Sequence, residues 1–513
     1  MHDPLMTVTS LASLIFATAI PITLCGCSPQ SGGAPNGLVQ HPTYKSSLIE
    51  KVPHIQQKPD FCGEACAAMY LNFLGEEVDQ DYVFDAAGVD PSVGRGLIAR
   101  ELNNALTQIG FKTGTVWSQV RSKRDVHRQF AYMLDDLSHQ IPSIVCMNTT
   151  RDASNTEHFR LVLGYDANTD EVIYHEPAKR NGAYQRMSAD RFIKLWPLKA
   201  SNIPDTVVRM RLEPGALSFG EKSVKRTAAD YVQHVIGKQP LIPRQFQVCV
   251  EPPFVVIGNG SAEQVHHHAS GTVRTTVDLL MKDFFTKEPS RILDIWVFEG
   301  ELSYRRYAAQ LFGDNPDTPY GYYDSAEGAM VMNIGLGGGT LVHEIVHPFM
   351  ETNFPDCPPW FNEGMGSLYE WPEVEDGHIY GVVNWRLEGL VNNIRTGSLG
   401  SFKRLMGLSR HQFYSITTSA NYAQSRYLLQ YLQYKGKLKT YYHAFVKNHK
   451  QDPTGLQTLK TTLHITNIHR FQQEWENWVL TLQPGTIPRA QMKAASQPPQ
   501  EKGPVSHSLR RKN

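Results

Sequence analysis

The sequence lacks an excess of charge of either sign. Its 513 residues include 50 Lys and Arg and 50 Asp and Glu, and beyond a short run at 510–512 no segment gathers basic residues. Proteins that bind nucleic acid use clusters of positive charge to neutralise phosphates. The sequence therefore predicts no nucleic-acid partner. Its 41% of hydrophobic residues can furnish sizeable cores, and its length predicts more than one domain.

Cysteine is scarce, and internal repeats are not visible. The four cysteines Cys66, Cys146, Cys249 and Cys357 show no paired spacing, which excludes a disulfide framework as the basis of the fold. Any pairing among Cys146, Cys249 and Cys357 stays open at this stage. The full set is Cys25, Cys27, Cys62, Cys66, Cys146, Cys249 and Cys357.

The apolar run at Leu11–Leu24 is too short to span a membrane as a helix. It leads into Cys25-Gly26-Cys27, and Leu24 with these residues resembles the Leu-x-Gly-Cys lipobox of bacterial lipoproteins. This resemblance implies that Cys27 is lipidated and becomes the mature N-terminus. An ordinary signal peptide cut nearby or an uncleaved anchor is the alternative. The first ten residues lack the Lys or Arg with which export signals usually start, which speaks against the prediction.

The predicted lipid anchor indicates the cellular location of the protein. We take residues 1–27 as a lipoprotein signal peptide and 28–47, whose first part is rich in Ser, Gly and Pro, as a flexible tether. Ser28 occupies the second mature position, where aspartate would favour retention in the inner membrane. We therefore expect an exported bacterial protein, lipid-anchored in the outer membrane and facing the periplasm or the cell surface.

A possible metal centre is marked by His343-Glu344-Ile345-Val346-His347. On a helix, His343 and His347 lie one turn apart on the same face, so both imidazoles can reach one zinc ion. Glu363, sixteen positions beyond His347, is the natural third ligand, and three protein ligands leave one position open for chemistry. Glu344 can polarise water and carry its proton. Pro348 predicts that the helix kinks or ends there. The pattern predicts a hydrolase with one zinc ion.

The surroundings of this motif strengthen the prediction. A predicted strand at 329–334 precedes a turn at 337–339, and Thr340 is expected to cap the metal-binding helix. With the downstream Asn-Glu-Gly at 362–364, this order resembles the gluzincin metallopeptidases over roughly residues 245 to 480. The resemblance implies that Tyr422 holds the oxyanion of the tetrahedral intermediate. The alternative for Tyr422 is simple packing in an amphipathic helix.

A second set of reactive residues lies in the N-terminal half. Cys62 stands at the expected start of a helix, where the helix dipole favours thiolate and should lower the thiol pKa. His158 opens one predicted strand, and Glu176 follows the next one. Two neighbouring antiparallel strands could present His158 as a base and Glu176 as its orienting partner, both directed at the cysteine.

This order of glutamine, Cys-Gly, histidine and acid-Pro resembles the papain-like peptidases that process double-glycine leaders of bacteriocins. The resemblance covers about residues 50 to 213 and implies that Cys62 is the nucleophile, His158 the base and Glu176 its partner. The resemblance further implies that Gln56, six residues before Cys62, is the oxyanion glutamine, with Gln57 left open. The chain departs from the family at Phe61, where aspartate is usual, and at Glu176-Pro177, where Asp-Pro is usual.

We therefore predict an α+β chain with a papain-like cysteine peptidase domain at 48–213 and a gluzincin-like zinc peptidase domain at 244–484. A linker at 214–243 joins them, and a disordered tail covers 485–513. The expected substrate is a peptide or protein. One rival hypothesis is a peptide-binding lipoprotein whose papain-like module captures substrate for the zinc site. Another is an inactive adaptor.

Overall fold

A computed structural model describes residues 44–149, 157–199, 205–220, 225–415 and 418–489. The predicted signal peptide, Cys27, most of the tether and the end of the tail lie outside these residues. Within the described part, no helix is both long enough and apolar enough to cross a membrane. Two regions are described in turn, an N-terminal region at 45–220 and a C-terminal region at 225–489.

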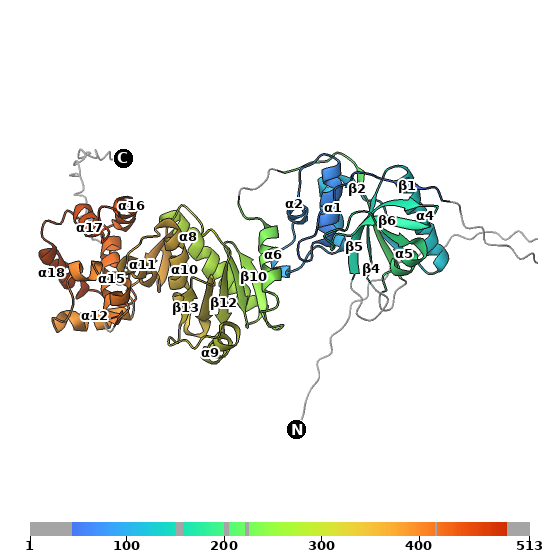
Figure 1. Cartoon of the computed structure of the whole chain (residues 1–513). Helices are drawn as coiled ribbons and strands as arrows, with labels where there is room; N and C mark the ends of the chain where they lie inside the picture. The colour runs from blue at the N-terminus through green and yellow to red at the C-terminus, as the bar shows by residue number, and fades with distance from the viewer. Residues whose placement is uncertain (1–43, 150–156, 200–204, 221–224, 416–417, 490–513) are drawn as a thin grey trace, which may run out of the picture. The chain divides into compact units, whose positions relative to one another are not determined.

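The N-terminal region combines a seven-stranded antiparallel sheet with five α-helices in its described residues (Figure 1). The strand order is β3-β8-β4-β5-β6-β7, and β1 pairs with β5. The strands are β1 Ser47–Leu48, β3 Trp117–Gln119, β4 Ser143–Asn148, β5 Glu157–Asp166, β6 Glu171–His175, β7 Gln185–Ser188 and β8 Thr206–Arg211; β2 Phe111–Lys112 pairs separately with β9 Glu213–Pro214. The helices are α1 Cys62–Phe73, α2 Gln80–Ala86, α3 Ala99–Ile109, α4 Lys123–Ser138 and α5 Ala189–Leu195.

Helix α1 is the central helix of this region. Every residue from Gly63 to Leu71 is buried, as expected of a helix that is largely apolar on all sides. A Cβ atom added to Gly63 would lie 2.6 Å from Leu102 Cδ2 and 3.2 Å from Phe159 Cδ2. The glycine after Cys62 therefore lets the start of α1 approach β5 closely.

The C-terminal region is built on a five-stranded sheet of order β10-β11-β12-β14-β13. The three inner strands run parallel, and each edge strand is antiparallel to its neighbour. Alternate residues face opposite layers: Val256 packs in the core with α8 and α10, whereas Val255 and Ile257 pack with α6 and α9. The strands are β10 Gln247–Glu251, β11 Phe254–Gly258, β12 Leu293–Phe298, β13 Gly321–Asp324 and β14 Ala329–Asn333.

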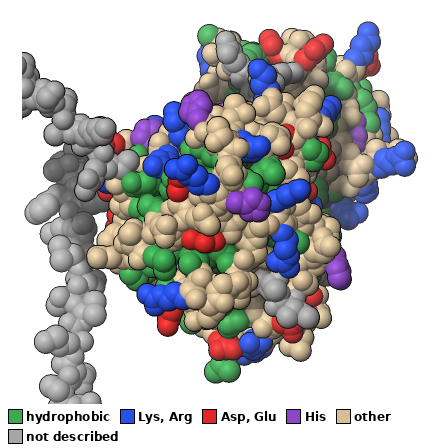
Figure 2. All heavy atoms as spheres, turned by 90° about the vertical axis from the view of Figure 1, so that its left-hand side faces the viewer, with side chains coloured by type: hydrophobic (Ala, Val, Ile, Leu, Met, Phe, Trp, Pro, Cys, Tyr) green, Lys and Arg blue, Asp and Glu red, His purple; other side chains and the backbone are tan. Residues whose placement is uncertain are grey.

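After β14 the chain is mostly helical, and α11 packs along α15. A small hairpin, β15 Pro372–Glu375 with β16 His378–Gly381, interrupts these helices. The helices of the region are α6 Ala228–Lys238, α7 Ala262–His266, a π-helix His267–Arg274, α8 Thr275–Asp283, α9 Glu301–Tyr307, a second π-helix Ala308–Phe312, a 3-10 helix Ile334–Leu336, α10 Gly339–Asn353, α11 Pro359–Leu368, α12 Arg386–Arg395, α13 Phe402–Met406, α14 Arg410–Phe413, α15 Thr418–Tyr434, α16 Leu438–Asn448, α17 Leu456–Thr462 and α18 Ile468–Val479. Figure 2 looks at the side that carries the last helices, where basic, acidic and apolar side chains are interspersed.

Of the two local predictions about the metal-binding helix, the cap at Thr340 is wrong, and Pro348 does not end the helix. Helix α10 begins at Gly339, so Gly338 and not Thr340 occupies the cap position. The helix also continues past Pro348 to Asn353. Because Pro348 is buried in the core, packing outweighs the single backbone hydrogen bond that proline removes.

The segment predicted as a linker contains an ordered helix. In α6, Tyr231 and Val235 pack in the same core as β11 and β12. His234 Nε2 lies 2.6 Å from the buried carboxylate of Asp294, and Lys238 Nζ lies 2.8 Å from its other oxygen. These contacts attach α6 to the C-terminal sheet.

Candidate active sites

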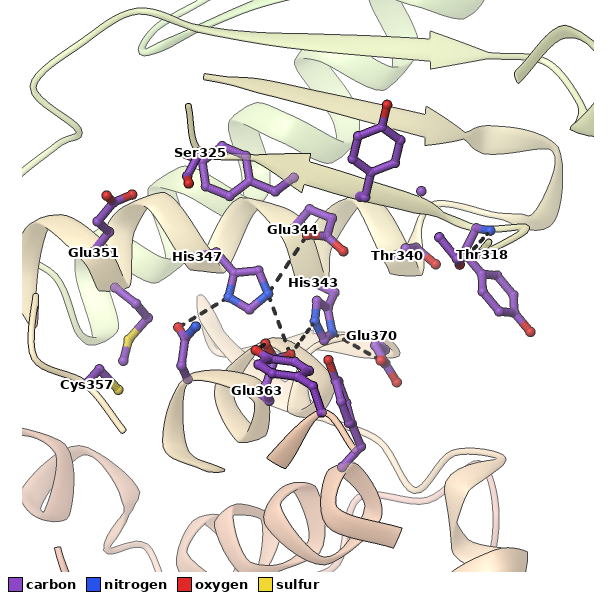
Figure 3. Close-up of a pocket in the computed structure, with 18 of the residues that line it drawn as sticks. Thr318, Ser325, Thr340, His343, Glu344, His347, Glu351, Cys357, Glu363 and Glu370 are labelled. Atoms are coloured by element: carbon purple, nitrogen blue, oxygen red, sulfur yellow. Dashed lines mark hydrogen bonds and ion pairs between the residues drawn. The ribbon is translucent and has the colours of Figure 1, made fainter. Parts of the chain in front are cut away.

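Helices α10 and α11 bring the three predicted zinc ligands together. The candidate ligand atoms of His343, His347 and Glu363 all lie within 4.8 Å of one another (Figure 3). His343 Nε2 is 3.2 Å from Glu363 Oε2, and His347 Nε2 is 3.8 Å from the same oxygen. Two atoms bound tetrahedrally to one zinc ion are about 3.3 Å apart. The three side chains therefore fit a zinc ion with little adjustment.

Further contacts orient both imidazoles. His343 Nδ1 lies 3.1 Å from Glu370 Oε1, and His347 Nδ1 lies 3.2 Å from Asn362 Oδ1. Arg386 holds Glu370 in turn, with hydrogen bonds to both carboxylate oxygens. Metal-ligating histidines usually donate their second N–H to such a partner, which fixes the tautomer and the ring. These contacts leave Nε2 of both rings for a shared ion.

The electrostatics of the cluster are those of a cation site. Burial acts to raise the pKa of Glu363, but the neighbouring histidines lower it to about 2. At Glu370, burial likewise acts to raise the pKa of the carboxyl, but the contacts with Arg386 and His343 lower it to about 2. Burial raises the pKa of Glu344, which makes it a better proton acceptor. Arg386 balances the charge of Glu370, whereas ionised Glu363 faces both histidines at the position where a divalent cation would be bound.

Two tyrosines flank the ligands. The ring of Tyr422 stacks on His343 with centroids 6.2 Å apart, and the guanidinium of Arg386 lies 5.1 Å from its centre. Tyr422 also shares a hydrogen bond with Glu363. The Tyr414 hydroxyl donates a hydrogen bond to Oε1 of Glu363. Tyr422 is the tyrosine that the family resemblance predicts, whereas no sequence pattern indicates Tyr414.

A cleft of about 900 Å³ surrounds this cluster. Edge strand β13 contributes Tyr322 and Tyr323 to its lining, and α10 lies along it (Figure 3). Exposed Trp385 and Arg410 also line the cleft. The cleft therefore offers an open sheet edge, aromatic walls and the metal-ligand cluster in one space.

The second candidate site lies where α1 meets β5. His158 Nε2 is 2.5 Å from Glu176 Oε1, and Arg160 Nε donates to Glu176 Oε2 at 2.8 Å. The Cys62 thiol hydrogen-bonds to the backbone of Phe159, the residue after His158. The structure thus brings the three predicted residues to one place. Because Nε2 of His158 faces Glu176, Nδ1 is the nitrogen left to serve the thiol.

The predicted activation of Cys62 by the helix start is wrong. Burial raises the pKa of the thiol to about 12, against a smaller opposing effect of the Phe159 backbone, and Glu64 and Asp60 add to the rise. At position 61, buried Phe61 stacks on Phe84 and provides no side-chain cap to α1. Burial therefore outweighs the helix dipole, and the thiol is neutral in this structure.

The pKa of Glu176, the carboxylate partner of His158, is lowered, in contrast to that of Cys62. Burial acts to raise the pKa of Glu176, but its contacts with His158 and Arg160 hold it at about 2. Glu176 is therefore ionised at neutral pH. No sequence pattern indicates a role for Arg160, although it lies two residues after His158 and hence on the same face of β5.

The two candidate oxyanion glutamines differ in the structure. Gln56 is exposed, and its backbone carbonyl accepts a hydrogen bond from Gln80. Gln57 donates its backbone N–H to Pro177, directly after Glu176, and its side-chain oxygen is buried. Gln57 is thus the one attached to the loop that carries the histidine partner.

Comparison with known proteins bears on the N-terminal region. Residues 49–201 match the Peptidase_C39 like family. The region is a C39-like, papain-like cysteine-peptidase domain. A crystal structure of the peptidase domain of Streptococcus ComA, described as a bi-functional ABC transporter involved in a quorum-sensing pathway, is similar at 19% identity, covering 31% of this chain and 96% of that chain, with a TM-score of 0.22. No curated protein compared with the chain matches it.

The family match suggests a peptidase, and a peptidase domain implies a peptide substrate. It does not reach the C-terminal region, where the gluzincin likeness stays a prediction.

Proposed function

We propose that this chain is a peptidase with two hydrolytic centres, a zinc centre in the C-terminal region and a cysteine centre in the N-terminal region. The observation that carries the zinc centre is the convergence of His343, His347 and Glu363, with their outer partners Glu370 and Asn362 in hydrogen-bonding distance. The C39-like family match supports the cysteine centre.

In the zinc centre, His343, His347 and Glu363 would hold the ion. Zinc in such a site polarises a peptide carbonyl and lowers the pKa of water. Glu344 accepts the proton of the attacking water and returns it to the leaving amine. Tyr422 donates a hydrogen bond to the oxygen that becomes negative.

Strand β13 provides the binding surface for the substrate. It ends the sheet among the described strands, pairing with β14 on one side, and its residues line the cleft. An extended peptide can add to such an edge through backbone hydrogen bonds, while pockets beside it read the side chains. This mode suits peptides of varied sequence.

In the cysteine centre, His158 takes the thiol proton as the sulfur of Cys62 attacks the peptide carbonyl. The C–N bond then breaks, the amine leaves with the proton from His158, and an acyl-enzyme remains on the sulfur. Water, deprotonated by His158, hydrolyses the thioester. Because the pKa of Cys62 is raised, proton transfer to His158 has to accompany attack. Glu176 stabilises the imidazolium formed at that moment.

One observation favours a second candidate function for the N-terminal region. The half-buried thiol has a raised pKa, and Phe61 stands where aspartate is usual in the resembling peptidases. A domain with these properties could capture peptides for the zinc centre without cutting them.

Digestion of a peptide mixture by the chain from Ser28 onward tests both proposals. Cleavage sites would be mapped for the wild type and for Glu344→Gln and Cys62→Ser, with Cys249→Ser, a half-buried cysteine outside both sites, as control. Two independent centres predict that each variant loses its own subset of sites. If Glu344→Gln abolishes all cleavage and Cys62→Ser changes none, the N-terminal region is a capture domain. If Glu344→Gln changes nothing, the zinc proposal fails.

We also propose that the protein is exported and lipid-anchored through Cys27 in the bacterial outer membrane. The lipobox-like segment at 24–27 supports this proposal, and it lies outside the described residues. Metabolic labelling with an alkyne fatty acid should mark the wild type and not Cys27→Ser. Equal labelling of both would overturn it.

A further inference from the structure

The cleft around the proposed zinc centre contains a positive charge that no described acidic side chain neutralises. Arg410 begins α14, lines the cleft and is exposed. The neighbouring residues outside the described part, Ile416 and Thr417, carry no carboxylate either. The other arginine of the lining, Arg386, is by contrast bound to both oxygens of Glu370. Arg410 is therefore the lining arginine left for a ligand.

Arg410 lies close to the ligand cluster. Its guanidinium carbon is 5.7 Å from the ring centre of Tyr414, whose hydroxyl donates to Glu363. A guanidinium that packs its face on an aromatic ring keeps its N–H edges for other partners. A group bound to those edges would lie within a few residues of a peptide bond held at the cluster, since an extended chain advances about 3.3 Å per residue.

The remaining charges of the cleft do not compete for this role. Glu344 and Glu363 face the two histidines, and Glu370 is paired with Arg386. Glu351 is exposed and lies on α10 one turn beyond His347, at the opposite end of that helix from Thr340 (Figure 3).

We propose that Arg410 is a specificity-determining residue that selects peptides carrying a carboxylate within a few residues of the cleaved bond. The inference rests on the zinc peptidase function proposed above. Guanidinium groups bind carboxylates through two parallel N–H···O bonds, which is a geometry that neutral side chains do not match. The carboxylate can be an Asp or Glu side chain or the C-terminus of the peptide.

The test begins with the cleavage sites of the zinc-loaded wild type in a peptide mixture. One peptide that is cut near an acidic group is then made in three forms: the parent, the Glu-to-Gln form and the form with an amidated C-terminus. The two altered peptides distinguish a side-chain carboxylate from a terminal one. Arg410→Ala, Arg410→Glu and the control Arg404→Ala, an exposed arginine outside the cleft lining, are compared.

Arg410→Ala should lower the ratio of kcat/KM for the parent over its neutral form by roughly ten- to a hundred-fold, as expected for a charge-assisted hydrogen bond. Arg410→Glu should invert the preference toward a lysine-containing peptide, and Arg404→Ala should keep the wild-type ratio. If the wild type cuts acidic and neutral forms equally, or if Arg410→Ala lowers both equally, the proposal is overturned.

Binding separates this inference from the proposed activity. Fluorescence anisotropy would measure binding of the labelled parent peptide and of its two altered forms to metal-free and zinc-loaded Glu344→Gln, with and without Arg410→Ala. Weaker binding of the parent alone after Arg410→Ala supports carboxylate selection even if no peptide is hydrolysed. Absence of any difference in binding overturns it, whatever the outcome for hydrolysis.

Discussion

Glu370 and His343 form a contact of 3.1 Å between a carboxylate oxygen and Nδ1, the ring nitrogen that does not face Glu363. Arg386 donates two hydrogen bonds to this carboxylate. The His343 imidazole is therefore oriented by a carboxylate that is itself paired with Arg386. Among the described residues, the partner of the equivalent nitrogen of His347 is the neutral amide of Asn362. The two histidines are therefore oriented with unequal strength.

We expect Glu370→Gln to weaken zinc binding by roughly ten- to a hundred-fold, the usual effect of removing an outer partner of a metal ligand. Competition with a chromophoric chelator measures the affinity, and circular dichroism checks the fold. Glu373→Gln, an exposed glutamate on β15, is the control. Unchanged zinc affinity would show that Glu370 does not orient the ligand.

The role of Tyr422 can be separated from simple packing. If its hydroxyl stabilises the oxyanion, Tyr422→Phe should lower kcat by roughly 10²- to 10³-fold with little change in KM. Tyr414→Phe and Tyr422→Phe each lose a hydrogen bond to Glu363 and should both weaken zinc binding, but only Tyr422→Phe should lower kcat once zinc is in excess. Steady-state kinetics with zinc in excess distinguish them. Full kcat in Tyr422→Phe would leave only the packing of its ring against His343.

The ionisation of Glu176 should make the free energy of unfolding depend on pH. Its pKa falls from an ordinary 4.5 to about 2 in the folded chain. A lowered acid pKa stabilises the fold above pH 4.5, and this contribution is lost as the pH drops toward 2. Glu176→Gln should therefore cost about 2–3 kcal/mol at pH 7 and much less near pH 3.

Urea unfolding at the two pH values measures this difference. Asp190→Asn, at an exposed position of α5, is the control. An equal loss of stability at pH 7 and pH 3 would contradict the assignment of the effect to ionised Glu176.

Glu64 should lower the free energy of unfolding as the pH rises, whereas Glu176 raises it. Glu64 is fully buried two residues after Cys62, and one of its oxygens accepts from the Leu97 N–H while the other has no partner in the described part. Burial raises its pKa to about 8. A raised acid pKa penalises the fold as pH rises from 4.5, with the full cost reached above about 8.

The wild type should thus lose up to about 4 kcal/mol of stability between pH 5 and pH 9, and Glu64→Gln should lose much less. Thermal unfolding across this range is the measurement, with exposed Glu263→Gln as control. Parallel pH profiles for wild type and Glu64→Gln would exclude Glu64 as the source.

Much of each site follows from residues that are near in sequence. The spacing of His343 and His347 places both rings on one helical face, because the period of an α-helix is local. Strand endings likewise led to the pairing of His158 with Glu176, which lie 2.5 Å apart. By contrast, the cap at Thr340 is wrong and Pro348 does not end the helix, because local preferences of about 1–3 kcal/mol yield to packing.

The sequence by itself determined which side chains are reactive and how those within one helix or neighbouring strands face. Only the tertiary structure decided what surrounds them. Glu370, Arg386 and Tyr414 come from separate segments and meet at the ligand cluster through the packing of the C-terminal helices. The raised pKa of Cys62 likewise depends on burial between α1 and β5. Burial and long-range contacts set local charge and dielectric, and no short sequence pattern encodes them.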